Sequence, residues 1–82
     1  MTRAKASQIA DRFLKSNISD YREKIDNKYS ISIAHSDNKI ETKLLENGCG
    51  INSICWYLED KDNVKNVISR SIMDLMYLLK EG

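Results

Sequence analysis

The chain contains no proline and only three glycines in 82 residues. Sandwiches and barrels need frequent tight turns, and proline and glycine supply the backbone conformations of many such turns. Their scarcity favours helices joined by short connections. A chain of this length holds one hydrophobic core, so we expect a single domain over residues 1–82.

Apolar side chains recur at helical spacing near both ends of the chain, with charged residues between them. This pattern is typical of amphipathic helices. The first predicted helix spans residues 4–16, with an apolar face of Ala6, Ile9, Ala10, Phe13 and Leu14. The last begins near residue 64, is capped by Asp62 or Asn63, and has an apolar face of Val64, Val67, Ile68, Ile72, Leu75, Met76 and Leu79.

Two further helices are predicted in the middle of the chain. After a stop at residues 16–20, Asn17 or Ser19 is a suitable N-cap, and Tyr21, Ile25 and Tyr29 follow at four-residue spacing. A third helix is predicted over 38–59 with Asp37 as its N-cap. Its apolar stripe, with spacings of three and four, is Ile40, Leu44, Gly48, Ile51, Cys55 and Leu58. The glycines at 48 and 50 indicate a weakened or closely packed point in this helix.

A different pattern competes within residues 29–45. Residues 29–33 and 40–44 alternate between apolar and polar side chains, as the two strands of a hairpin do. Six positions in helical register outweigh five alternating ones. The sequence therefore predicts an all-α fold, a small antiparallel four-helix bundle, and leaves an α+β fold with a hairpin at 29–45 as the alternative.

The net charge is +1, so bulk charge does not indicate nucleic acid or an anionic membrane. The charge is nevertheless uneven, because residues 31–62 carry six acidic and only three basic side chains. Two cysteines without a secretory signal, and no apolar run long enough to span a bilayer, predict a cytoplasmic protein without a membrane anchor.

The residues that carry chemistry are few. His35 is the single histidine, and Cys49 and Cys55 are the two thiols. An exposed histidine in a turn explains His35 better than a Cys–His nucleophile does. Two cysteines and one histidine without metal-ligand spacing do not make a zinc site. We therefore expect a non-catalytic protein without a metal or cofactor.

The segment from 56 to 62 combines aromatic and acidic side chains. Glu59, Asp60 and Asp62 follow directly after Trp56 and Tyr57. An exposed aromatic residue beside carboxylates is typical of surfaces that anchor protein partners. A charged turn that caps the last helix is an equally good interpretation of the same residues.

Three segments resemble the colicin D immunity protein family. Residues 13–21, FLKSNISDY, resemble the entry into the second helix of that family, Phe-Leu-x-Ser-x-Ile-Thr/Ser. Residues 47–50 and 54–62 resemble its Asn-Cys-Gly segment, hydrophobic helix end and acidic turn. The chain departs from the family by lacking the proline of that turn, by a shorter connection between the second and third helices, and by a less acidic balance.

The resemblance implies a four-helix immunity protein that covers the basic active site of a tRNA-cleaving toxin, a bacteriocin or contact-dependent toxin. It implies that the acidic turn at Glu59, Asp60 and Asp62 contacts the toxin. Because carboxylates form charge-assisted bonds to lysine, arginine or histidine, we expect Asp37, Glu41 and Glu46 to add to the negative potential that faces the toxin. We expect Trp56 or Tyr57 to anchor the complex, and no direct contact with nucleic acid.

The alternative is a small nucleic-acid-binding or regulatory protein. Seven basic side chains within the first 28 residues provide phosphate contacts on the first two predicted helices, although acids interleave with them. They are Arg3, Lys5, Arg12, Lys15, Arg22, Lys24 and Lys28. A third possibility is a plain helical adaptor whose acidic turn only caps a helix.

Overall fold

The computed structural model, which describes residues 2–81, contains two helices and four strands. The elements are α1 (Arg3–Ser16), β1 (Asp20–Lys24), β2 (Tyr29–Ser36), β3 (Lys39–Glu46), β4 (Cys49–Tyr57) and α2 (Val64–Glu81). The predicted all-α four-helix bundle is therefore wrong, and the fold is α+β. The alternative with a hairpin at 29–45 is confirmed, because β2 and β3 pair antiparallel.

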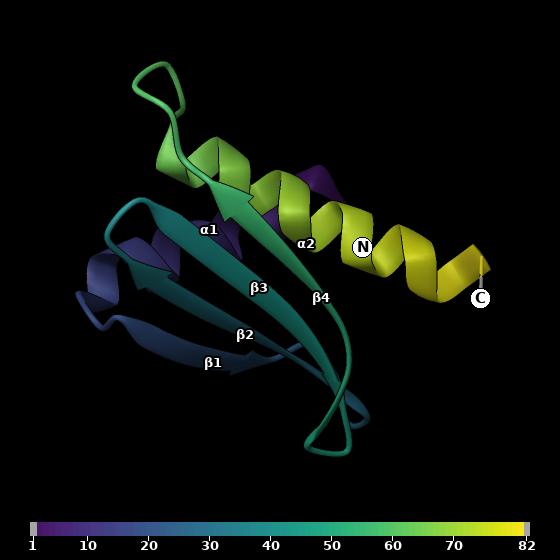
Figure 1. Ribbon diagram of the computed structural model, residues 1–82. Helices are drawn as coiled ribbons and strands as arrows, with labels where there is room; N and C mark the ends of the chain where they lie inside the picture. Colours follow the sequence, from purple (N-terminus) through teal and green to yellow (C-terminus); the bar gives the residue numbers. More distant parts are fainter. Residues whose placement is uncertain (1, 82) are drawn as a thin grey trace.

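The strands form one antiparallel sheet in the order β1-β2-β3-β4, so that each strand pairs with its neighbour in the chain. Both helices lie on the same face of this sheet (Figure 1). They run antiparallel to each other, since Lys65 of α2 lies 3.0 Å from Asp11 of α1 while Arg3 and Arg70 line one groove. The opposite face of the sheet is uncovered, and we call it the open face.

The helices at the two ends of the chain are confirmed. At the start of α1, the side chain of Thr2 accepts a hydrogen bond from the Lys5 backbone N–H at 3.2 Å. Asn17 ends this helix in the left-handed conformation, with φ 56°. At the start of α2, the Asn63 side chain accepts from the Asn66 N–H at 3.1 Å. These caps satisfy backbone groups that a helix leaves free at its ends.

The predicted second helix is wrong because a spacing of four fits a strand as well as a helix. Residues an even number apart lie on the same face of a strand. Tyr21 of β1 faces the helices, where its ring meets Phe13 edge-on at 5.9 Å between centroids. Tyr29 opens β2, and Ile25 lies in the connection between these strands. All three predicted stripe residues, Tyr21, Ile25 and Tyr29, pack against the core.

The predicted third helix, over 38–59, is replaced by β3, β4 and two turns. Asn47 and Gly48 both have positive φ, 51° and 86°, which is the signature of a tight hairpin turn. Gly48 therefore serves a turn and not the packing of helices. Asp37 has φ 52° and lies in the turn between β2 and β3, so it is not an N-cap.

The core lies between the helix-facing side of the sheet and the two helices. Each strand contributes alternate residues to it, because side chains alternate between the faces of a sheet. The largest contributors are fully or almost fully buried: Ile9, Phe13, Ile31, Ile33, Ile40, Leu44, Ile68, Ile72 and Leu75. Burial of each such side chain is worth about 1.5–3 kcal/mol. This single core fixes the orientation of the open face and of the loops at its ends.

Candidate functional site

Most of the predicted acidic residues gather at one end of the sheet, at the last residues of β2 and β4 and the first of β3. The turn between β2 and β3 meets the β4–α2 loop there, because the Leu58 N–H donates to the Asn38 carbonyl at 2.6 Å. In Figure 1 this loop projects beyond the sheet. We call this region the acidic end. It holds five carboxylates, Asp37, Glu41, Glu59, Asp60 and Asp62, and two lysines, Lys39 and Lys61.

The three carboxylates of the β4–α2 loop have different roles. The Asp62 Oδ2 accepts a hydrogen bond from the Glu59 N–H at 2.7 Å, and the Asp62 N–H donates to the Glu59 carbonyl at 2.9 Å. Asp62 therefore shapes the loop. The Glu59 side chain, 69% exposed, lies 3.4 Å from the exposed amine of Lys61. Glu59 and Asp60 are the loop carboxylates that remain accessible to a partner.

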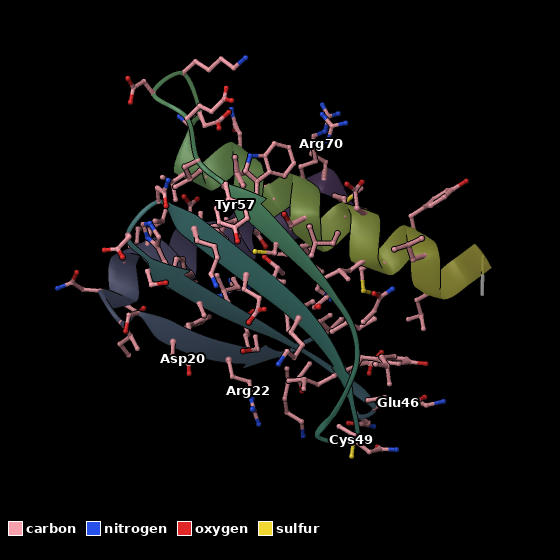
Figure 2. The ribbon with its side chains drawn as sticks, viewed as in Figure 1. Asp20, Arg22, Glu46, Cys49, Tyr57 and Arg70 are labelled. Carbon is pink, nitrogen blue, oxygen red and sulfur yellow. The ribbon has the colours of Figure 1, made fainter. Side chains whose placement is uncertain are left out.

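Trp56 and Tyr57 are adjacent in β4 and point to opposite faces of the sheet. Trp56 is half-buried and packs against the core, so its ring stabilises the fold. Tyr57 is 66% exposed and lies on the open face, in front of the sheet in Figure 2. Of the two predicted anchors, Tyr57 is the accessible one.

The remaining two predicted carboxylates, Glu41 and Glu46, lie on the same strand but do not act together. Glu41 lies on the open face, opposite Cys55 in the register of β3 and β4. Glu46 lies at the far end of β3, about 17 Å away at about 3.3 Å per residue. There its carboxylate is 3.0 Å from the Lys28 amine, and the Tyr29 hydroxyl donates to it at 3.4 Å. Glu46 therefore does not belong to the acidic end.

The basic face expected on the first two helices is not formed, because residues 20–24 are a strand. Two of the seven cations of this region, Arg12 and Lys28, are already paired with carboxylates. Arg12 binds Glu23, and Lys28 binds Glu46, a hydrogen bond that raises the pKa of Lys28. Arg22 and Lys24 lie instead on the open face of β1, where Figure 2 shows Arg22 and Asp20 projecting away from the helices.

The thiols and the imidazole do not meet. Cys49 and Cys55 are free and exposed, whereas His35 lies on the helix-facing side of β2, opposite Ile40. Cys55 lies on the open face, so the sheet separates it from His35. Among residues 2–81, no group of three or more His, Cys, Asp and Glu side chains is placed to hold a metal ion.

The register of the sheet places charges of opposite sign in neighbouring rows across the open face. One row, which we call the acidic row, consists of Asp20, Ala34, Glu41 and Cys55. The next row, the basic row, consists of Arg22, Ser32, Lys43 and Ser53. The sequence contains the same charges as acid-x-base triplets at 20–22 and 41–43. These triplets predict charged rows across a sheet only if both segments are strands.

A shallow hollow lies at the start of β4. Its volume is about 340 Å³, and its lining residues are Lys43, Gly50, Ile51, Asn52 and Ser53. Gly50 lies on the open face, because a Cβ atom there would meet the Cδ of Lys43 at 3.2 Å. The missing side chain of Gly50 therefore contributes to the hollow.

Comparisons of the chain with protein-family models, with curated proteins and with solved structures find no match. Across the described part of the chain, neither helix combines the length and the apolar character that a bilayer crossing requires.

Proposed function

We propose that this chain is a protein-binding module that presents the carboxylates of its acidic end to a basic surface of a partner. One observation carries this proposal: five carboxylates gather at one end of a protein whose net charge is +1. Asp37, Glu59 and Asp60 extend from two loops that a backbone hydrogen bond joins. Within residues 2–81, Asp37 and Asp60 form no ion pair, so their charges are available to a partner.

The partner that we favour is the RNA-cleaving domain of a toxin, which makes the chain an immunity protein. A nuclease active site is basic because it must hold phosphates, and carboxylates on a rigid scaffold can occupy the same positions. The resemblance of residues 13–21, 47–50 and 54–62 to the colicin D immunity family supports this partner. The helical bundle that the resemblance implied is absent, so the contact would be made from a sheet end.

The test begins with co-expression of the tagged protein and the product of the neighbouring gene. We expect a stoichiometric complex in which cleavage of tRNA is suppressed. The triple variant D37N/E59Q/D60N retains Asp62, and hence the loop. We expect it to bind at least about 30-fold more weakly, since loss of one partner of a buried interfacial charge pair costs about 2–5 kcal/mol.

The matched control is E46Q, which removes a carboxylate at the opposite end of β3. It should leave the affinity unchanged. Equal affinity of the triple variant and the natural chain would overturn the assignment of the acidic end. Purification of the natural chain with bound nucleic acid and no protein would instead favour a role for the cations of the open face.

A further inference from the structure

We infer that the open face binds the open face of a second copy of this chain. The two copies are related by a two-fold axis that lies between the two sheets, parallel to the rows and midway between the acidic row and the basic row. Two observations carry the inference: the order of charges on this face and the positions of one exposed ring and one hollow. It does not depend on the proposed function.

The charges of the open face are complementary to themselves. A two-fold axis between the two rows lays the acidic row of each copy on the basic row of the other. Asp20 then lies opposite the partner's Arg22, and Glu41 opposite the partner's Lys43. Each pair occurs twice, because the same patch is used by both copies in such an interface. The other two lysines of the face, Lys24 and Lys39, lie in the outer rows, away from the axis.

The shape of β4 fits the same axis. Tyr57 lies one row beyond the acidic row, and Gly50 lies one row beyond the basic row on the same strand. The axis therefore places the ring of Tyr57, 66% exposed, over the hollow at the partner's Gly50. Its volume of about 340 Å³ is large enough for an aromatic ring.

The residues of β2 on this face permit a close approach of the two sheets. They are all small: Ser30, Ser32, Ala34 and Ser36. Sheets that pack face to face lie about 10 Å apart with large side chains interdigitated between them, so the small side chains of β2 leave room for the long side chains of the flanking strands. Long side chains occur on the flanking strands, where the charges meet.

The size of the face sets the strength of the association. Four strands about 4.8 Å apart and about seven residues long give a flat patch of roughly 450 Å² per copy. Two such patches bury roughly 900 Å², which is below the range of about 1,200–2,000 Å² for stable specific interfaces, so the dimer should be weak and reversible. The dimer covers Glu41 and Tyr57, whereas Asp37, Glu59 and Asp60 lie in loops beyond the strands and stay accessible in both copies.

The test is sedimentation equilibrium of the purified chain from about 10 µM to about 1 mM, a range that detects dissociation constants of weak complexes. We expect a monomer–dimer equilibrium whose dissociation constant rises with salt. The variants E41K and K43E should each raise this constant at least about tenfold, because like charges then face each other across the axis. Y57S should also raise it, whereas E59Q should have no effect.

A mixture of the two charge variants gives the decisive result. E41K has lysines at both positions 41 and 43, and K43E has glutamates at both. Each variant therefore repels a second copy of itself and is complementary to the other variant. We expect the equimolar mixture to form heterodimers with an affinity near that of the natural chain. A mixture that stays monomeric, single variants that dimerise normally, or a natural chain that is monomeric at about 1 mM would each overturn the inference. Circular dichroism of the variants verifies that they are folded.

Discussion

Arg12 of α1 and Glu23 of β1 form a bidentate ion pair that joins the helices to an edge of the sheet. The Nε of Arg12 donates to one carboxylate oxygen at 2.8 Å, and a second guanidinium nitrogen donates to the other oxygen. The Tyr21 hydroxyl donates to the same carboxylate at 2.7 Å. Chiefly through the hydrogen bonds from Arg12, the pKa of Glu23 lies below its ordinary value.

This pair predicts a pH dependence of stability. Because the pKa of Glu23 is lower in the folded chain than in the unfolded chain, the folded chain binds fewer protons there. Its contribution is complete above the ordinary carboxylate range and is lost as the pH falls from that range to the lower pKa of Glu23 in the folded chain. We expect E23Q to lower the free energy of unfolding by about 1 kcal/mol at neutral pH and by less in acid. Urea titrations between pH 7 and pH 3 measure the difference.

The control for this prediction is E59Q, which changes an exposed carboxylate whose partner, Lys61, is also exposed. Its free energy of unfolding should follow that of the natural chain at each pH. Identical pH profiles for E23Q and E59Q would contradict the role of the Arg12–Glu23 pair.

The same substitution at two threonines should have opposite effects. Thr42 is fully buried in β3, and its hydroxyl has no hydrogen-bond partner. T42V replaces this hydroxyl by a methyl group of similar size, and we expect it to stabilise the chain by about 1 kcal/mol. T2V removes the N-cap of α1 and should destabilise by about 1 kcal/mol. Thermal unfolding should therefore shift upward for T42V and downward for T2V, and a fall for both would refute the prediction for Thr42.

The turn between β3 and β4 should depend on the backbone conformation of Gly48 and not on the space around it. Its φ is +86°, and a Cβ atom there would meet nothing within 4 Å. G48A should therefore destabilise by about 1 kcal/mol or more through conformational strain, without a steric clash. N47G is the matched control, because φ is also positive at residue 47 and glycine tolerates it. Urea unfolding should separate the two variants, and equal stabilities would contradict this explanation.

Of the carboxylates in the β4–α2 loop, Asp62 should stabilise the folded chain and Asp60 should not. D62A removes the acceptor of the Glu59 N–H and should lower the free energy of unfolding by about 1 kcal/mol. D60A removes an exposed carboxylate and should stay within about 0.5 kcal/mol of the natural chain. Hydrogen exchange of the Glu59 amide gives a local test, with faster exchange expected only in D62A.

One turn signal in the sequence was missed, because Gly48 was interpreted as a weakened or closely packed point of a helix. An Asn-Gly pair between two apolar segments is a strong hairpin signal, and Asn47-Gly48 forms such a turn. The stripe of Ile40, Leu44 and Gly48 favoured a helix because its spacing of four is common to the helix repeat and to one face of a strand. The alternation over 29–33 and 40–44 distinguished the two and was the better guide.

The residues of the candidate site were also predicted only in part from the sequence. Glu59, Asp60 and Tyr57 were predicted from their order in the chain and are accessible in the structure. Asp37 was predicted both as a toxin-facing carboxylate and as an N-cap, and in the structure it lies in a turn at the same end of the sheet. Trp56 and Glu46 were predicted as contacts, but the alternation of side chains in β4 and the pairing with Lys28 give them structural roles.

The sequence by itself determined the two terminal helices, because a broad apolar face at a spacing of three and four has no equivalent in a strand. It also determined an acidic segment after Tyr57. Only the tertiary structure decided that residues 20–57 form a sheet, since burial of one face of each strand against both helices outweighs local preference. The tertiary structure alone also placed Glu41 and Lys43 in neighbouring rows with Asp20 and Arg22, because strand register is set by the turns and by the burial of one face of each strand.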